Sequence, residues 1–418
     1  FLDRQYRNEN SRTTEWSTRA DHLAYVEGLF DELSGTGISD ALTRFANSLQ
    51  EVSKNPVNKE YRTNLLQNAS NLADVLTHFS AQLTEKQADQ DQAIVVSVNQ
   101  VNVIARSIGD LNTQISKYEL SGQKANDLRD KRNMLLDELS GLTGFEASEN
   151  TDGELQVRIG GELLIDHDQI RTLATVLSID NPITGADDSL HGIVWEDTGT
   201  AAPIQGGSIH ALLNLRDGAS ANEIGMPYLN EQLNRLARGI AESFNQVHEA
   251  GWTMPADSNG NVSVTGVPFF TTSNGAAVFT AANISVNPAI AQDVFRIAAS
   301  SVQITNSTLQ GNNGNALELL TLFDSSALPD IGSYNGFLDS LVGEIAVETE
   351  ESSTRLTSEL TLLSSLDQQR QSVSAVSLDE EATNLIKYQH SYAAAARLIT
   401  AIDEALDVLI NRTGVVGR

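Results

Sequence analysis

Residues able to do catalytic or metal-binding chemistry are scattered along this chain. Its seven histidines lack the spacing of a metal site, and the absence of cysteine removes disulfides, thiolate ligands and thiol catalysis together. His248 and Glu249 begin like the H-E-x-x-H helix of a zinc protease, but Trp252 stands where the second histidine is required. The sequence therefore argues against a metalloprotease.

Three further motifs are incomplete. Asp166-His167-Asp168 carries metal-ligand types, yet a solvated turn after a strand is the favoured interpretation. Residues 257–261 begin like a calcium loop, but Val262 replaces its glycine, so a turn is again favoured. Residues 206–210 lack the closing glycine of a nucleophile elbow. We predict no catalytic residue, no cofactor and no metal, although the abundant carboxylates leave a glycosidase pair open.

The charge balance narrows the classes of partner. The chain has 418 residues, 27 Lys and Arg against 55 Asp and Glu, and a net charge of −28. Phosphate binding needs clustered cations, so this balance argues against nucleic acid and anionic membrane surfaces. No apolar run is long enough to span a bilayer, and 40% hydrophobic residues are too many for wholesale disorder. The length suggests roughly three domains.

A long helix is predicted in the first half. Residues 57–108 contain no Gly and no Pro, and apolar residues recur there at steps of three and four. A continuous helix over this stretch is roughly 75 Å long. A polar gap at Gln87 and Gln90 leaves a break into two helices as the alternative, but one near-continuous rod is favoured.

Two segments depart from the helical pattern. In residues 146–207, Leu155 to Ile159 and Leu163 to Ile165 alternate around Gly160-Gly161, which predicts a β-hairpin. This segment has 12 acidic residues against two arginines, so it is interpreted as an acidic β insert. Residues 251–312 are rich in Gly, Asn, Ser, Thr and Val, which favours a neutral β or irregular insert.

The last segment is predicted to be an assembly helix. Ser377-Leu378-Asp379-Glu380 reads as a capping box that starts it. A long apolar stripe follows, and such a helix needs another helix against it. Ala393–Ala396 would let that partner approach closely. The residues predicted to bind it are Leu378, Ala382, Leu385, Ile386, Tyr388, Tyr392, Ala396, Ile399, Ile402, Leu406 and Leu409.

The predicted fold class is α+β but mainly α: an elongated long-helix bundle with two β-rich inserted modules and a C-terminal amphipathic helix. We expect the long first-half helix and the terminal helix to lie side by side, with the β modules looped out at one end. The expected segments are a helical bundle in three parts (1–145, 208–250 and 313–373), an acidic insert (146–207), a neutral insert (251–312) and the assembly helix (374–418).

Several stretches resemble the hook-associated protein 1 family of bacterial flagella. They are 125–140, 206–217 leading to the helix around 244–248, 268–271, 311–317 and, most specifically, 377–396 with its Ser-Leu-Asp-Glu-Glu-Ala and Asn-Leu-Ile-Lys-Tyr-Gln runs. The last stretch is similar to the C-terminal element shared by flagellar rod, hook and hook-associated proteins. The family's N-terminal amphipathic helix and Asn-rich Thr-Pro-Gly-Tyr stretch are absent, so a truncated or proteolysed form is expected.

The resemblance implies a structural role without catalysis. Family members form a ring joining hook to filament, with outward-facing β modules and lateral packing of the helical body. The implied partners are the hook protein, the second junction protein, neighbouring copies and a cytosolic export chaperone on the C-terminal segment. The implied location is the extracellular flagellum, reached through the flagellar export channel. Flagellin or the second junction protein, a cell-wall-degrading glycosidase and a host-facing adhesin are the alternatives.

Overall fold

The computed structural model describes residues 1–30, 37–120, 122–150, 153–255, 263–325, 328–374 and 378–412. The chain divides into two units, Arg4–Leu363 and a smaller one formed by Phe1–Asp3 with Ser364–Arg418. The helices are α1 (Leu2–Phe30), α2 (Ile38–Lys54), α3 (Lys59–Glu119), α4 (Asn126–Leu142), α5 (Gly207–Asp217), α6 (Met226–Ala250), α7 (Pro288–Gln292), α8 (Gly314–Asp324), α9 (Tyr334–Ser374) and α10 (Leu378–Asp407). Short turns of helix are η2 (Val294–Arg296), η3 (Ser307–Leu309) and η4 (Val408–Arg412).

The strands are short and antiparallel. They are β1 (Glu146–Glu149), β2 (Leu155–Ile159), β3 (Glu162–Asp166), β4 (Gln169–Ile170), β5 (Leu173–Ile179), β6 (Leu190–Trp195), β7 (Ala219–Ser220), β8 (Glu223–Ile224), β9 (Phe270–Thr272) and β10 (Ile284–Val286). Among the described residues, β1 to β4 form one sheet, and β5–β6, β7–β8 and β9–β10 form two-stranded ribbons. Within these same ranges, no helix is long and apolar enough to cross a membrane.

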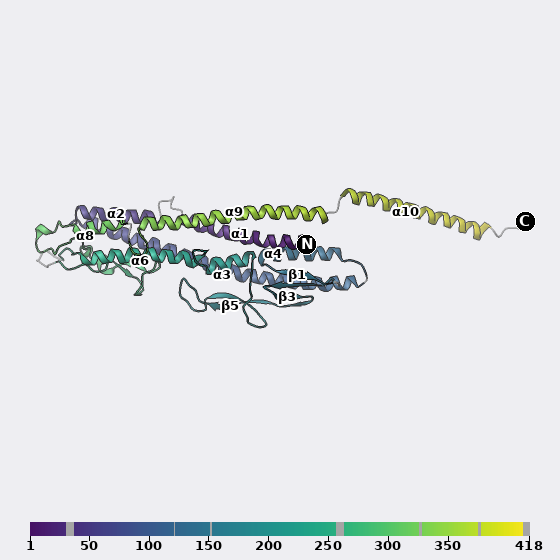
Figure 1. Cartoon of the computed structure of the whole chain (residues 1–418), viewed down its shortest axis with the longest axis horizontal. Coiled ribbons are helices and arrows are strands. Elements are labelled where there is room, and N and C mark those ends of the chain that lie inside the picture. Colours follow the sequence, from purple (N-terminus) through teal and green to yellow (C-terminus); the bar gives the residue numbers. More distant parts are fainter. Residues whose placement is uncertain are drawn as a thin grey trace, which may run out of the picture. The chain divides into compact units, whose positions relative to one another are not determined.

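Helix α3 is the axis of the larger unit (Figure 1). The Asn58 side chain caps it by accepting a hydrogen bond from the Tyr61 amide at 3.1 Å. The helix continues unbroken for 61 residues, about 90 Å, so the predicted rod is confirmed and is longer than expected. Position 109 inside this helix is a glycine, because β4 approaches the helix closely there. A Cβ at this position would lie 2.7 Å from the Cδ1 atom of Ile170.

The polar gap in α3 separates two hydrophobic cores. The N-terminal part of α3, up to Leu83, packs with α2, α6, α8 and α9 in one core. The C-terminal part, from Ile94, packs with α4, α5 and strands β2 to β6 in another. Between them the buried Gln87 side chain donates to the Arg216 carbonyl oxygen at 3.0 Å. The gap is therefore a buried polar layer between two cores, since the side chains of α3 find polar partners there.

The acidic insert contains the predicted hairpin. Strands β2 and β3 pair across Gly160 and Gly161, which both have positive φ, as a tight two-residue turn requires. The insert rests on the C-terminal half of α3: Asn102 exchanges hydrogen bonds with the Leu173 backbone, and the Asn112 amide donates to the Leu155 carbonyl oxygen. Figure 1 shows these strands along that part of α3.

Residues 263–312 pack on the other half of α3. Thr77 of α3 donates to the Ala281 carbonyl oxygen, and the buried Arg62 donates to those of Val294 and Ile297. Phe269 and Phe270 belong to the core formed by α2, α3 and α6. The expectation that both inserts loop out at one end is therefore wrong. The two β-containing segments cover opposite halves of a single helix, which local patterning does not reveal.

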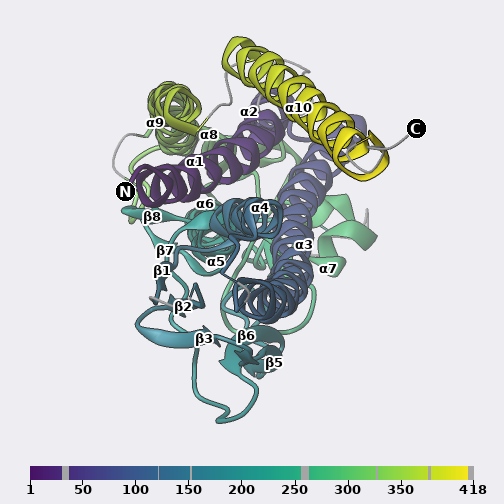
Figure 2. The ribbon, with the colours of Figure 1, turned by 90° about the vertical axis from the view of Figure 1, so that its right-hand side faces the viewer.

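The seam of α3 is covered inside its own unit by α2, α4, α5 and α6. The expected pairing of this seam with the terminal helix is therefore not needed to bury it. Figure 2 shows the larger unit end-on, with α1, α4, α5 and α6 gathered around α3. In the smaller unit, α10 is a separate helix of 30 residues. The predicted capping box at Ser377 lies outside the described residues.

Candidate assembly site

The predicted assembly residues lie on α10 and its continuation η4. Leu385, Tyr388, Tyr392, Ile399, Ile402, Leu406 and Leu409 are all exposed, with exposed fractions between 46% and 79%. Ile386, Ala382 and Ala396 are exposed as well, whereas the side chain of Leu378 lies outside the described residues. Burying such side chains is normally the main stabilising contribution of an amphipathic helix. This helix keeps them available for a partner.

The exposed residues follow a strict seven-residue repeat. Leu385, Tyr392, Ile399 and Leu406 are spaced by seven, and the second set of Tyr388, Ala395, Ile402 and Leu409 is offset by three. A 3.5-residue apolar period matches a left-handed coiled coil, because it keeps one seam facing the partner helix. We call these eight residues the heptad stripe. Ala395 is the small residue of the stripe, so a partner helix can approach α10 closely there.

Sequence reasoning missed three neighbours of the stripe. Leu398, Val408 and Ile410 are also exposed. Leu398 and Ile410 flank the core positions of the repeat, where coiled coils use side chains to widen the contact. Leu398 directly precedes Ile399 and Ile410 directly follows Leu409, so including the residues next to the core positions of the repeat would have found both.

The histidine singled out by sequence is a structural bridge. His248 lies in the last turn of α6 and is fully buried. Its Nδ1 lies 2.7 Å from the Val267 carbonyl oxygen, and its Nε2 accepts from the Ala298 amide at 2.9 Å. A carbonyl can only accept, so Nδ1 carries the proton and the ring is neutral. Burial is the main cause that lowers the pKa of His248, to about 4.

We expect this bridge to weaken in acid. The pKa of His248 is about 4 in the folded chain and 6.5 as its ordinary value, so protons bind the unfolded chain first. Its contribution to stability is present above pH 6.5 and lost as the pH falls toward 4, by about 3 kcal/mol at 1.36 kcal/mol per pKa unit. Urea unfolding at pH 7.5 and 4.5 measures this loss.

His248→Gln is the matched control, because a glutamine amide can donate and accept without titrating. We expect its free energy of unfolding to fall less than that of the unchanged chain between the two pH values. Equal falls in both proteins would contradict the assignment of this pH dependence to His248.

The other motifs are structural too. Asp166 ends β3, and His167 and Asp168 form the turn to β4, as favoured from sequence, with His167 at a positive φ of 61°. Residues 206–210 begin α5, and the calcium-like residues 257–261 lie outside the described residues. Within the described ranges, no three His, Asp or Glu side chains are grouped to hold a metal ion.

A buried ionic cluster joins the acidic insert to the helices. Asp91 of α3 accepts from the His191 amide at 2.8 Å and from Arg216 Nη1 at 2.6 Å. The ring Nδ1 of His191 lies 2.6 Å from the second Asp91 oxygen. Burial would raise the pKa of Asp91, but the hydrogen bonds from His191 and Arg216 lower it overall. This cluster ties α3, β6 and α5 together.

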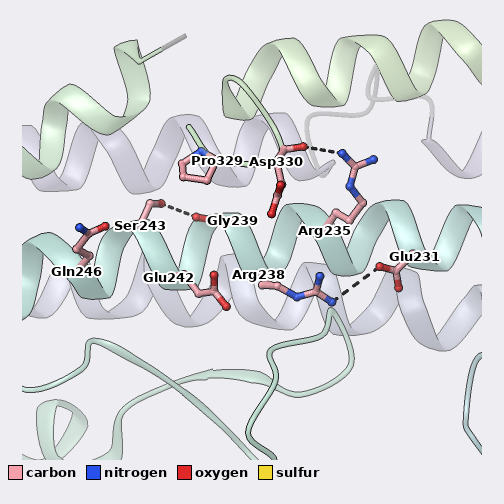
Figure 3. A pocket seen from close by; sticks show the side chains of 9 residues that line it. All are labelled: Glu231, Arg235, Arg238, Gly239, Glu242, Ser243, Gln246, Pro329 and Asp330. Carbon is pink, nitrogen blue, oxygen red and sulfur yellow. Dashed lines mark hydrogen bonds and ion pairs between the residues drawn. The ribbon is translucent and has the colours of Figure 1, made fainter. Parts of the chain in front are cut away.

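The cavity in Figure 3 lies beside α6 and the 329–330 turn. Its volume is about 240 Å³, which is smaller than the roughly 300–1,000 Å³ of ordinary small-molecule sites. Arg235 donates to the Asp330 carbonyl oxygen at 2.5 Å, and Arg238 lies 3.8 Å from Glu231. Ser243 donates to the Gly239 carbonyl oxygen, so this hydroxyl is tied to its own helix and is not poised as a nucleophile.

Comparisons with known proteins agree with the predicted fold class. Residues 23–270 match the profile of the flagellar hook-associated protein FlgK helical domain, and residues 367–412 match that of the flagellar basal body rod FlgEFG protein C-terminal region. The solved structure of the flagellar hook junction protein FlgK from Burkholderia pseudomallei has a TM-score of 0.70 and 16% identity, covering 90% of this chain and 100% of that one. A mainly helical fold with small antiparallel sheets is thereby confirmed.

Curated relatives align along nearly the whole chain. Flagellar hook-associated protein 1 of Bacillus subtilis is 29% identical over 439 residues, covering 100% of this chain and 84% of the relative. The protein of the same name from Salmonella typhimurium is 24% identical over 493 residues, covering 98% and 87%.

Proposed function

Because the chain belongs to the flagellar hook-associated protein FlgK family, we propose that the heptad stripe of α10 is what builds it into the flagellum. The family is structural, not catalytic, and the chain is a structural protein of the extracellular hook–filament junction. The family match sets aside the glycosidase and adhesin alternatives, and full-length relatives named hook-associated protein 1 set aside flagellin and the second junction protein.

The observation that carries the proposal is the exposed heptad stripe. Seven large apolar side chains stay uncovered along one face, and a strict repeat selects a helix as the occupant. The stripe also lies within residues 367–412, which match the C-terminal region of rod proteins. A shared C-terminal region in axial proteins of different parts of the flagellum supports a shared assembly role.

We propose the following partners for the chain. In the assembled flagellum α10 meets helices of neighbouring copies in a ring, with the hook protein on one side and the second junction protein on the other. Before export, a cytosolic chaperone covers the same stripe, because exposed apolar area of this kind promotes aggregation. The helical body packs laterally, and the acidic insert at 146–207 faces outward. We also propose that the chain is organised as a helical bundle in three parts (1–145, 208–250 and 313–373), two inserts (146–207 and 251–312) and the assembly helix (374–418).

The proposal is tested by removing the protein from its bacterium. We expect cells that keep their hooks but carry no attached filaments, with filament subunits released into the medium. Reintroducing the unchanged chain together with any residues that precede it in its gene should restore attachment. Filaments anchored normally on hooks in the deletion strain would refute a junction role.

A further inference from the structure

Helices α1 and α9 lie side by side in the larger unit through a polar seam (Figures 1 and 2). Arg19 of α1 pairs with Glu348 of α9, with Nη2 and Oε1 2.5 Å apart. The ring of Trp16 has two guanidinium groups over it, Arg19 at 5.9 Å and Arg355 at 4.8 Å. Charges and cation–π contacts therefore hold this seam, in contrast to the apolar cores around α3.

Further along the same seam, two carboxyl groups meet across the helices. Glu9 of α1 is 8% exposed, and its carboxyl group is within hydrogen-bonding contact of that of Glu359 on α9. Glu9 Oε1 and Glu359 Oε2 are buried without a hydrogen-bond partner, as are the hydroxyls of Thr13 and Ser352 on the same two helices. Buried polar atoms that lack partners destabilise a fold, so this part of the seam is poorly satisfied.

The neighbouring charged groups do not balance a negative charge on the Glu9 carboxyl group. The charged groups that face it are Glu359 from α9 and Arg12 from its own helix. Burial first, then the hydrogen bond and the charge of Glu359, raise the pKa of Glu9 to about 7, while Arg12 acts in the opposite direction. Arg355, which lies one turn from Glu359, is paired with Glu351 at 2.6 Å. The pair is therefore stable when it shares one proton and strained when both carboxyls are ionised.

We propose that Glu9 and Glu359 form a proton-operated clasp that holds α9 against α1 in mild acid and loosens this seam at alkaline pH. A carboxyl whose affinity for protons is higher in the folded state stabilises that state at low pH. The stabilisation is lost as the pH rises from the ordinary value of 4.5 through about 7. The clasp acts on the helix that precedes α10 in the chain, so it regulates how firmly that helix is held.

The test is hydrogen exchange of the full chain at pH 5.5 and 8.0, corrected for the intrinsic effect of pH. We expect backbone amides of α1 around Glu9 and of α9 around Glu359 to exchange at least about tenfold faster at pH 8.0, the equivalent of one pKa unit of coupling. Amides of α3 should not follow this change. A site-resolved readout is needed because His248 gives the larger unit a pH dependence of opposite sign.

Glu9→Gln and Glu359→Gln separate the clasp from general effects of pH. A glutamine amide can donate to the remaining carboxylate at either pH, so both variants should keep the pH 5.5 level of protection at pH 8.0. Glu350→Gln is the matched control: it removes an exposed carboxylate elsewhere on α9 and should leave the pH dependence in place.

Three outcomes would overturn the proposal. The first is equal protection of α1 and α9 in the unchanged chain at both pH values. The second is an unchanged pH dependence in both Glu9→Gln and Glu359→Gln. The third is protection at pH 8.0 that returns on adding calcium and disappears with a chelator, which would put a cation in place of the shared proton.

Discussion

We expect cells that carry Ile399→Asp to assemble hooks but to fail to attach filaments. Ile399 lies in the middle of the heptad stripe and is 65% exposed, so its side chain contributes little to the packing of the described residues. A coiled coil would bury the new carboxylate against a partner helix, and an unpaired buried charge is strongly unfavourable. Leu385→Asp, two heptads earlier in the stripe, should act in the same way. Electron microscopy of cells and immunodetection of released filament subunits measure the loss.

The matched control for this variant is Thr400→Asp. Thr400 is the next residue along α10 and is exposed, but it lies outside the heptad stripe. Both substitutions introduce one aspartate into the same turn, so they alter helix propensity and net charge alike. We expect Thr400→Asp to retain attached filaments and both proteins to show the same circular dichroism. Normal attachment with Ile399→Asp, or loss with both variants, would contradict an assembly role for the stripe.

We expect Arg216→Met to cause a large loss in the free energy of unfolding. The Arg216 side chain is fully buried and Asp91 is 10% exposed, so methionine leaves the Asp91 carboxylate without its main counter-charge. Removing one partner of a buried ion pair typically destabilises a protein by about 3–5 kcal/mol. The Nε and Nη2 bonds of Arg216 to Asp217, both 2.7 Å, are lost as well, although water can replace them at the exposed Asp217. Urea unfolding followed by circular dichroism measures the change.

Two further variants identify the buried charge as the cause. Arg44→Met breaks an exposed pair with Asp40 one turn away, and exposed helix pairs contribute only about 0.3–0.5 kcal/mol. Adding Asp91→Asn to Arg216→Met removes the unpaired charge, so we expect the double variant to recover part of the lost stability. A cost below about 1 kcal/mol for Arg216→Met, or no recovery in the double variant, would refute the assignment.

Local patterns predicted the elements well. The stretch without Gly or Pro became part of α3, the alternation around Gly160-Gly161 became the β2–β3 hairpin, and the apolar stripe of the last segment became an exposed face of α10. Each of these features depends on residues within a few positions of one another. Helix and strand periods are properties of the local backbone, so a single sequence is enough to read them.

Buried polar positions were harder to interpret. The gap at Gln87 and Gln90 left open a break in the long helix, but the helix continues because Gln87 meets the backbone of Arg216, 129 positions away. His248 resembled the start of a metal motif, and its real partners are backbone groups of Val267 and Ala298. A polar residue on an apolar face shows that a partner exists without showing which one.

By itself, the sequence determined the helical character, the acidic insert, the likeness to a flagellar family and the uncovered stripe of α10. Only the tertiary structure decided that the two β-containing segments lie on opposite halves of α3, that Asp91 meets Arg216, and that Glu9 faces Glu359. The physical reason is that periodicity fixes which face of an element is buried. Which other element packs against that buried face depends on contacts between residues separated by more than a hundred positions.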